Sequence, residues 1–196
     1  IPIELDRHSH LRAHDRRVFR ARLVADRLHQ QAVDAGAVFA SDAEVFHRGE
    51  LHFRGGRAAV DKKAYPEMDE FWHDLSAAYR GEVADLAHRG CRYLQFDDTV
   101  WAYLCSDKEL AQARERGDKT DDLQQKYRDM INLSLKDKPS DMVVTMHACR
   151  GNFRSTFVSS GGYEPVADVL FNKIGIDGYF LEYDSERAGG FEPLRF

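Results

Sequence analysis

Hydrophobic positions along the chain follow two different periodicities. Residues 66–89 carry apolar side chains three and four positions apart, among them Phe71 and Trp72, and Gly90 comes directly after the segment. That spacing predicts one long helix with a single apolar face, which ends at the glycine. The same kind of spacing predicts further helices over residues 11–35 and 121–135 and from about Pro165 onward.

Short runs of aromatic, aliphatic and β-branched residues separate the later helices. Residues 91–98, 141–149 and 178–184 are nearly continuous in such side chains, and each run ends in charged or polar ones. Continuous hydrophobicity predicts strands that are covered on both faces. The order of strand, helix, strand, helix and strand predicts a parallel sheet with right-handed crossovers, and therefore the α/β class. Residues 35–56 hold two more short apolar runs, at 38–40 and 45–46, that are candidate strands between glycine turns.

The loops that follow the predicted strands distinguish between two α/β architectures. Neither G-x-G-x-x-G nor G-x-x-x-x-G-K-[ST] follows any of them, which disfavours an open nucleotide-binding sheet and favours a (β/α)8 TIM-type barrel. About four strands are recognisable in 196 residues, so we expect an incomplete set of barrel strands. We treat residues 1–196 as a single domain and, since the chain lacks an initiator methionine and stops without a closing helix, expect it to be a piece of a longer protein.

Composition narrows the possible partners and the compartment. The chain has 28 Lys and Arg against 33 Asp and Glu, a net charge of −5, so a nucleic-acid partner is not expected. No apolar run has the length of a membrane span, and the N-terminus has no targeting pattern, so we expect no membrane partner. Cys91, Cys105 and Cys149 form neither an even disulfide set nor a C-x-x-C motif, which indicates reduced thiols and a cytoplasmic protein.

Groups that suit acid–base or metal chemistry end three successive predicted strands: Asp97 with Asp98, His147 with Cys149, and Glu182 with Asp184. Parallel strands bring their carboxyl ends to one edge, so these side chains should converge. His147 and Cys149 are two residues apart and share a face of their strand. Imidazole, thiolate and carboxylate are ligands that zinc takes, and three protein ligands leave a position for substrate. His147, Cys149 and Glu182 are therefore a candidate zinc site; the alternative is an inert buried cysteine beside a histidine bonded to the backbone.

Two residues of the loop after His147 and Cys149 are candidates for substrate binding. Arg150 and Asn152 could bind a substrate carboxylate, since the guanidinium offers two parallel donors. The other interpretation is that Arg150 pairs with carboxylates of the strand ends and holds them together. The same two interpretations apply to Arg187, and the sequence leaves both open.

The segments around these residues resemble a known enzyme family. They are GCRYLQFDDT at 90–99, HACRGNFRS at 147–155, GGYEPVA at 161–167 and FLEYDSERAG at 180–189. Together they resemble the C-terminal catalytic domain of cobalamin-independent methionine synthase, and more closely the short single-domain relatives of that enzyme. The likeness extends from about residue 52 to residue 196 and leaves the N-terminal portion, residues 1–51, unmatched.

The resemblance implies a (β/α)8 barrel with zinc held by His, Cys, Glu and a second Cys. The first three ligands fall on His147, Cys149 and Glu182, and the second Cys lies on a strand beyond the last residue. It also implies that Asp97 contacts the amino group of the substrate, while Asp98 stands where the larger enzymes have glutamate. The family's histidine proton donor and its Gly-Ser segment have no counterpart here, so we expect the proton donor outside this chain.

The activity that the resemblance implies is that of a 5-methyltetrahydropteroyltriglutamate–homocysteine S-methyltransferase, an enzyme of methionine biosynthesis. A methyl group would pass from 5-methyltetrahydrofolate, or a related donor, to the thiol of homocysteine, which zinc activates as a thiolate. One alternative keeps zinc but changes the small thiol or the donor, for example to a corrinoid or another methylated metabolite. Another is a non-catalytic or decarboxylase-like barrel relative. Two further possibilities are a homo-oligomer and a split barrel whose partner chain supplies the fourth zinc ligand.

Overall fold

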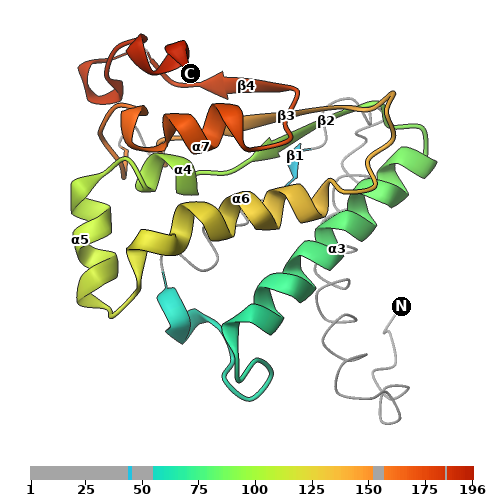
Figure 1. The fold of residues 1–196 in the computed structure, drawn as a ribbon, viewed down its shortest axis with the longest axis horizontal. Coiled ribbons are helices and arrows are strands. Elements are labelled where there is room, and N and C mark those ends of the chain that lie inside the picture. The colour runs from blue at the N-terminus through green and yellow to red at the C-terminus, as the bar shows by residue number, and fades with distance from the viewer. Residues whose placement is uncertain (1–43, 46–54, 152–156, 184) are drawn as a thin grey trace, which may run out of the picture.

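A parallel sheet forms the centre of the protein. The computed structural model describes residues 44–45, 55–151, 157–183 and 185–196. The strands are β1 (Glu44–Val45), β2 (Tyr93–Asp97), β3 (Val143–Ala148) and β4 (Gly178–Leu181), and they lie in that order with every neighbouring pair parallel (Figure 1). The three strands predicted from the later hydrophobic runs are thereby confirmed, and the candidate at residues 45–46 overlaps β1. The predicted helix over 11–35 and the candidate strand at 38–40 lie outside the described residues.

Helices occupy the connections between the strands. The described α-helices are α3 (Met68–His88), α4 (Val100–Tyr103), α5 (Asp107–Glu115), α6 (Leu123–Ser134) and α7 (Ala167–Asn172). Short 3₁₀ turns are η1 (Gly56–Ala59), η2 (Thr120–Asp122), η3 (Glu164–Val166), η4 (Glu186–Ala188) and η5 (Glu192–Arg195). The predictions for 66–89 and 121–135 correspond to α3 and α6, and the helix expected from Pro165 is η3 followed by α7. Sequence periodicity missed α4 and α5, because each is too short to show a clear apolar repeat.

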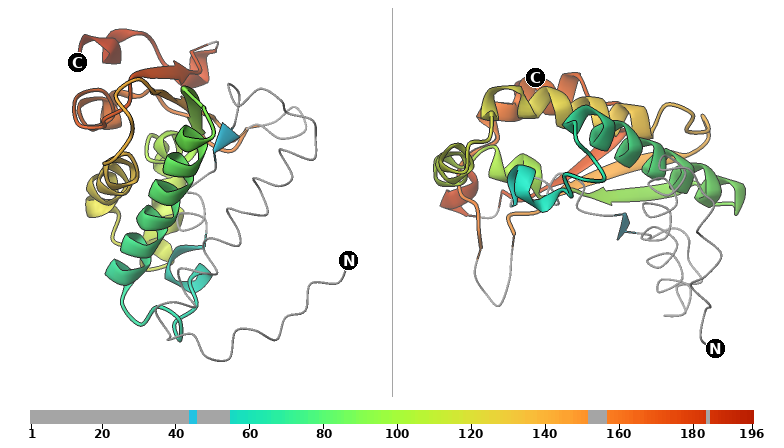
Figure 2. Two further views of the ribbon diagram at one scale, coloured as in Figure 1. Left: turned by 90° about the vertical axis from the view of Figure 1, so that its right-hand side faces the viewer. Right: turned by 90° about the horizontal axis from the view of Figure 1, so that it is seen from below.

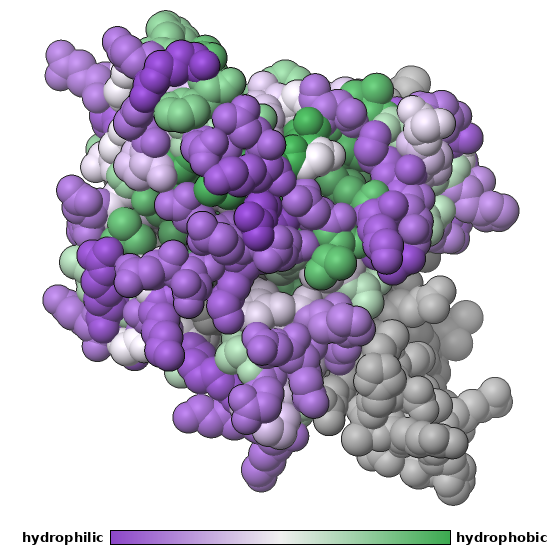
Figure 3. Space-filling view, viewed as in Figure 1, coloured by the Kyte–Doolittle hydropathy of each residue, from purple (hydrophilic) through white to green (hydrophobic). Residues whose placement is uncertain are grey.

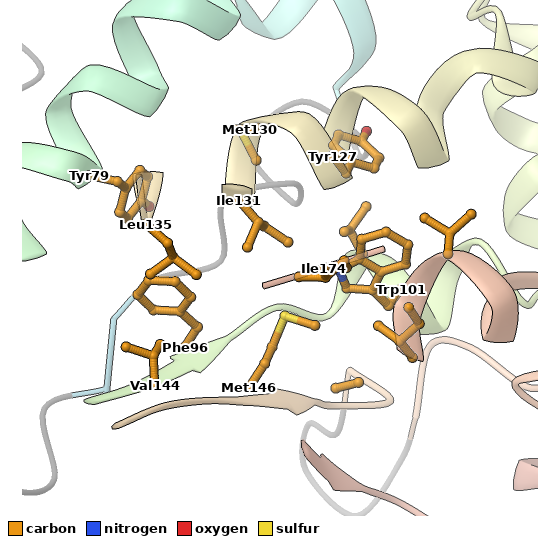
Figure 4. Packing of buried hydrophobic residues seen from close by; sticks show 14 of the residues in the cluster. Tyr79, Phe96, Trp101, Tyr127, Met130, Ile131, Leu135, Val144, Met146 and Ile174 are labelled. Atoms are coloured by element: carbon orange, nitrogen blue, oxygen red, sulfur yellow. The ribbon is translucent and has the colours of Figure 1, made fainter. Parts of the chain in front are cut away.

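The core lies between the sheet and the helices on one of its faces. Leu94 and Phe96 of β2 and Val144 and Met146 of β3 are at most 1% exposed. They are alternate residues, so all four point to the same face. Figure 4 shows Phe96, Val144 and Met146 turned toward α6, and Figure 2 shows α3, α6 and α7 on that side of the sheet.

The opposite face of the sheet differs from the sequence-based expectation. Continuous hydrophobicity predicts strands buried on both faces, yet most described residues of this face are partly exposed: Tyr93, Gln95 and Asp97 are half-buried and Phe180 is 49% exposed, while Thr145 is buried. The reason is that β2 alternates apolar residues with polar ones, so its polar side chains share the second face. The described strands form an open sheet with β1 and β4 at its edges. They agree with part of a (β/α)8 barrel, but they do not close one.

The outer surface of the helices is mainly hydrophilic (Figure 3). Among the described helices, none combines the length and the apolar character needed to cross a membrane.

Gly161, which lies between β3 and α7, packs closely against Cys105, just after the end of α4. Gly161 has a φ of +126°, and a Cβ atom at this position would overlap the carbonyl oxygen of Cys105. Its N–H donates to the carbonyl of Arg187 at 2.7 Å. The chain can follow this path only with glycine at residue 161.

Two glycine-to-alanine substitutions should have opposite effects on the stability of the fold. Gly161→Ala should lower the free energy of unfolding by about 2 kcal/mol or more, because it adds a clash to a strained backbone. Gly81, within α3, has open space around its Cα, so Gly81→Ala should raise stability by about 0.5–1 kcal/mol through helix propensity. Urea denaturation followed by circular dichroism measures both. Equal stability of the two variants would contradict the packing described for Gly161.

Candidate functional site

Three predicted site residues converge at the carboxyl edge of the sheet. Asp97 pairs in register with His147, and His147 pairs with Phe180, two residues before Glu182. The N–H of Asp98 donates to the carbonyl of His147 at 2.9 Å and extends the β2–β3 ladder. The expectation that parallel strand ends converge is therefore met for Asp97, His147 and Glu182, while Asp184 lies outside the described residues.

The imidazole of His147 lies between two carboxylates. Its Nδ1 atom is 3.2 Å from Oδ1 of Asp97, and its Nε2 atom is 3.7 Å from Oε1 of Glu182. The three side chains are 18–26% exposed, so solvent reaches them from one side. The other oxygen of Glu182, Oε2, is 3.8 Å from Nη2 of Arg187. Acidic and basic groups thus alternate along the edge in the order Asp97, His147, Glu182 and Arg187.

This order determines how a neutral imidazole is arranged. A carboxylate only accepts hydrogen bonds, so Asp97 favours the tautomer with the proton on Nδ1 of His147. The lone pair of Nε2 then faces the carboxylate of Glu182. Two electron-rich atoms in this position are stabilised by a proton or a metal cation between them. The arrangement can therefore bind a cation or hold a proton at Nε2.

Cys149 lies directly after β3 and is half-buried. Its Sγ atom accepts the backbone N–H of Gly151 at 3.3 Å. Within the part of the chain that the structure describes, no three His, Cys, Asp or Glu side chains are arranged to hold a metal ion. The structure thus places His147 against Glu182, while Cys149 as their common partner stays a prediction.

Asp98 lies away from the exposed edge. Its side chain is buried, and its Oδ1 atom accepts the N–H of Val100 at 3.4 Å, at the first residue of α4. This contact connects the end of β2 to the helix that follows. A role of Asp98 in substrate binding stays a prediction.

Arg150 is fully buried, at 0% exposure. Its Nη1 donates to the carbonyl of Gly161 at 2.6 Å, its Nη2 to that of Ala188 at 3.5 Å, and its guanidinium lies 4.2 Å from the ring centre of Tyr163. The hydrogen bonds of this guanidinium thus go to backbone carbonyls, and neither sequence-based interpretation of Arg150 includes them. Substrate binding by Arg150 stays a prediction that would require the side chain to leave these contacts. Asn152 lies outside the described residues.

Tyr163 is a site residue that sequence reasoning missed. Its buried hydroxyl donates to the carbonyl of Ala148 at 3.3 Å and accepts the N–H of Glu182 at 3.2 Å. Burial raises the pKa of Tyr163, so the hydroxyl stays protonated. From sequence alone, a tyrosine in a loop is usually assigned a packing role. The one signal that could have identified Tyr163 was its position inside the GGYEPVA segment.

Comparisons with known proteins find relatives that match about three-quarters of the chain. No protein-family model matches the chain. Two uncharacterized Bacillus subtilis proteins are similar: YxjG, 46% identical over 74% of this chain, and YxjH, 43% identical over 70%. A crystal structure from Listeria monocytogenes, of a protein provisionally named a vitamin-B12-independent methionine synthase, matches 72% of this chain with 39% identity and a TM-score of 0.56.

These relatives are much longer than the matched part. The chain spans 38% of YxjG, 36% of YxjH and 38% of the Listeria chain. The Listeria protein bears the name of the enzyme family that the sequence motifs resemble, which supports that resemblance and the α/β fold class.

The three cysteines differ in burial, which predicts an order of reactivity. Burial raises the pKa of Cys91 and raises the pKa of Cys105 to about 12, so both are thiols at neutral pH, and both are nearly inaccessible. Cys149 is more exposed, so iodoacetamide at pH 8 should modify Cys149 first. Peptide mapping by mass spectrometry measures the order, and in urea all three should react at similar rates. Faster labelling of Cys105 than of Cys149 in the folded protein would contradict the burial described here.

Proposed function

We propose that the chain is part of a catalytic barrel of the vitamin-B12-independent methionine synthase type. Its activity would be transfer of a methyl group from 5-methyltetrahydrofolate, or a related donor, to the thiol of homocysteine. The observation that carries this proposal is the imidazole of His147 between the carboxylates of Asp97 and Glu182 at the edge of a parallel sheet. The partial match to the Listeria protein supports the same activity.

Zinc is the proposed cofactor, and His147, Cys149 and Glu182 would hold it. Two ligands bound at about 2.1 Å to one tetrahedral zinc ion lie about 3.4 Å apart. Nε2 of His147 and Oε1 of Glu182 are 3.7 Å apart, close to that separation. The donor chemistry therefore fits zinc, with the third ligand supplied from Cys149, two residues after His147. A bound zinc ion would lower the pKa of a substrate thiol and stabilise the thiolate as the nucleophile.

The neighbouring side chains of this chain would orient the ligands and the substrate. Oδ1 of Asp97 lies 3.2 Å from Nδ1 of His147, so its negative charge would favour the proton on Nδ1 and keep Nε2 available, as a carboxylate commonly does behind a metal-binding histidine. Arg187 lies beside Oε2 of Glu182 and balances its charge. We also propose that Asp97 binds the amino group of an amino-acid thiol. The ammonium of that substrate would then lie next to the imidazole that helps to hold its sulfur.

Methyl transfer from a tertiary amine also needs a proton at the departing nitrogen. We propose that this proton donor and the fourth zinc ligand belong to the part of the relatives that the chain does not span. None of the three cysteines, Cys91, Cys105 and Cys149, forms a disulfide, which supports a reducing, cytoplasmic location for such an enzyme.

Zinc content tests the proposal directly. The protein loaded with zinc and freed of excess metal should contain close to one zinc per chain, and His147→Ala and Cys149→Ser should each lose it, because each removes one of three ligands. His88→Ala is a matched control, since His88 is exposed at the end of α3 and should leave the zinc content unchanged. Elemental analysis gives the ratio. A parent protein without zinc after loading would contradict the proposed methyltransferase and favour the non-catalytic or decarboxylase-like alternative.

A zinc-containing protein then allows the substrates to be distinguished. Homocysteine is compared with other small thiols by their ability to shift the visible spectrum of the cobalt-substituted protein. Methyl donors, including methyltetrahydrofolate and methylcorrinoids, are compared by methyl transfer in the presence of the thiol that binds. A response to another thiol but not to homocysteine would replace the acceptor in the proposal while keeping the zinc chemistry.

The contact between Asp97 and His147 predicts a second effect on the metal. Asp97→Asn should weaken zinc affinity about 10–100-fold, since an amide is a weaker acceptor for the Nδ1 proton. Asp141→Asn is the control, because Asp141 pairs with Arg92 on the surface at the far end of β3. Competition with a chromophoric chelator measures the affinities. Equal affinity of the Asp97 variant and the parent would show that Asp97 does not support His147.

A further inference from the structure

The hydroxyl of Tyr163 lies between the ends of two adjacent strands. It donates to the carbonyl of Ala148, the last residue of β3, and accepts the N–H of Glu182, the residue after β4. Ala148 precedes Cys149 directly. One buried side chain thus contacts the backbone beside two of the proposed zinc ligands, Cys149 and Glu182.

This hydroxyl stands where a sheet hydrogen bond is expected. The carbonyl of His147 accepts from β2, so the carbonyl of Ala148, the next residue, points toward β4. Ala148 pairs in register with Leu181, and the next hydrogen bond of a regular parallel ladder would join the N–H of Glu182 to the carbonyl of Ala148. Both of these groups bond to Tyr163 instead. The two strands therefore separate at their carboxyl ends by the space that one oxygen atom occupies.

The separation of the two strand ends affects the distance between two proposed zinc ligands. His147 and Glu182 project from β3 and from the end of β4, and their nearest side-chain atoms are 3.7 Å apart. A direct hydrogen bond would bring these atoms to about 2.9 Å. Their actual separation leaves room for an ion that both side chains bind. The spacing between the strand ends is thus part of the geometry of the proposed metal site.

Several contacts hold Tyr163 in place. The guanidinium of Arg150 stacks on its ring, and Arg150 itself is bound to the carbonyls of Gly161 and Ala188. The ring of Tyr183 also packs against the ring of Tyr163, at a centroid distance of 5.3 Å. A side chain held this firmly can define a distance between the backbone groups that it connects.

We infer that Tyr163 is a positioning residue, whose hydroxyl sets the spacing between the strand ends that carry Cys149 and Glu182. This inference rests on the proposed function for the role of that spacing in zinc binding. The hydroxyl takes no part in the chemistry, because it is buried and both of its hydrogen bonds go to the backbone.

The test compares Tyr163→Phe with Tyr179→Phe. The hydroxyl of Tyr179 also donates to a backbone carbonyl, that of Leu170, in a part-buried hydrogen bond, but Tyr179 lies near the start of β4, away from the site. Each variant removes one hydroxyl and keeps the ring, so both should melt at a somewhat lower temperature than the parent. Thermal stability therefore does not separate them, and two other measurements do.

The first measurement uses the metal-free protein. Nuclear magnetic resonance should show changed chemical shifts for the amide of Glu182 and the carbonyl of Ala148 in Tyr163→Phe, because both groups lose their hydrogen bond to the hydroxyl. The same two chemical shifts should stay unchanged in Tyr179→Phe. Unchanged resonances in Tyr163→Phe would overturn the inference.

The second measurement is zinc affinity by chelator competition. Tyr163→Phe should bind zinc about 10–100-fold more weakly than the parent, as expected when support behind metal ligands is lost, while Tyr179→Phe should stay close to the parent. Parental affinity in Tyr163→Phe, or an equal loss in Tyr179→Phe, would overturn the positioning role. A parent that binds no zinc contradicts the proposed function instead, and the resonances of Glu182 and Ala148 then decide whether the hydroxyl of Tyr163 joins the two strand ends.

Discussion

The parallel register of β2, β3 and β4 is the constraint on which the site depends. It places Asp97 beside His147 and carries β4 far enough for Glu182 to reach the same edge. The register in turn depends on the alternation of side chains, since Leu94, Phe96, Val144 and Met146 must all face the helices. A slip by one residue would bury the charged side chains against α6 and expose the core. Burial of the apolar face therefore also determines which functional groups meet on the other face.

A buried cation connects the segments around this edge. Removing a guanidinium from water costs several kcal/mol, and the carbonyls of Gly161 and Ala188 together with the ring of Tyr163 offset that cost for Arg150. Because Arg150 follows Cys149 directly, its anchoring also fixes the backbone of the proposed ligand. Arg150 thus connects Gly161 and Tyr163, which follow β3, with Ala188, which follows β4.

Much of the fold could be predicted from the sequence, because its signals were local. The long apolar repeat of α3 and the hydrophobic runs of β2, β3 and β4 each depend on residues close together in the chain. The convergence of His147 and Glu182 also followed, since a parallel sheet dictates it.

What the sequence did not predict depends on contacts between distant segments. The hydroxyl of Tyr163 joins residues 15 and 19 positions away in opposite directions, and the partners of Arg150 are carbonyls, which every residue has. The exposure of the second sheet face was missed because the strands were read as continuous runs, although the polar residues Gln95, Asp97 and His147 interrupt them at alternate positions. The closed barrel and the position of Cys149 relative to Glu182 stay predictions.

The contacts of Arg150 and Tyr163 have an evolutionary consequence. Their hydrogen-bond partners are main-chain groups, at Ala148, Gly161, Glu182 and Ala188. A substitution at Ala148 or Ala188 that fits the available space leaves the carbonyl in place, so these positions can vary without loss of the network. Evolution can therefore change the side chains around the site, and with them its ligand specificity, as long as Arg150 and Tyr163 are both retained.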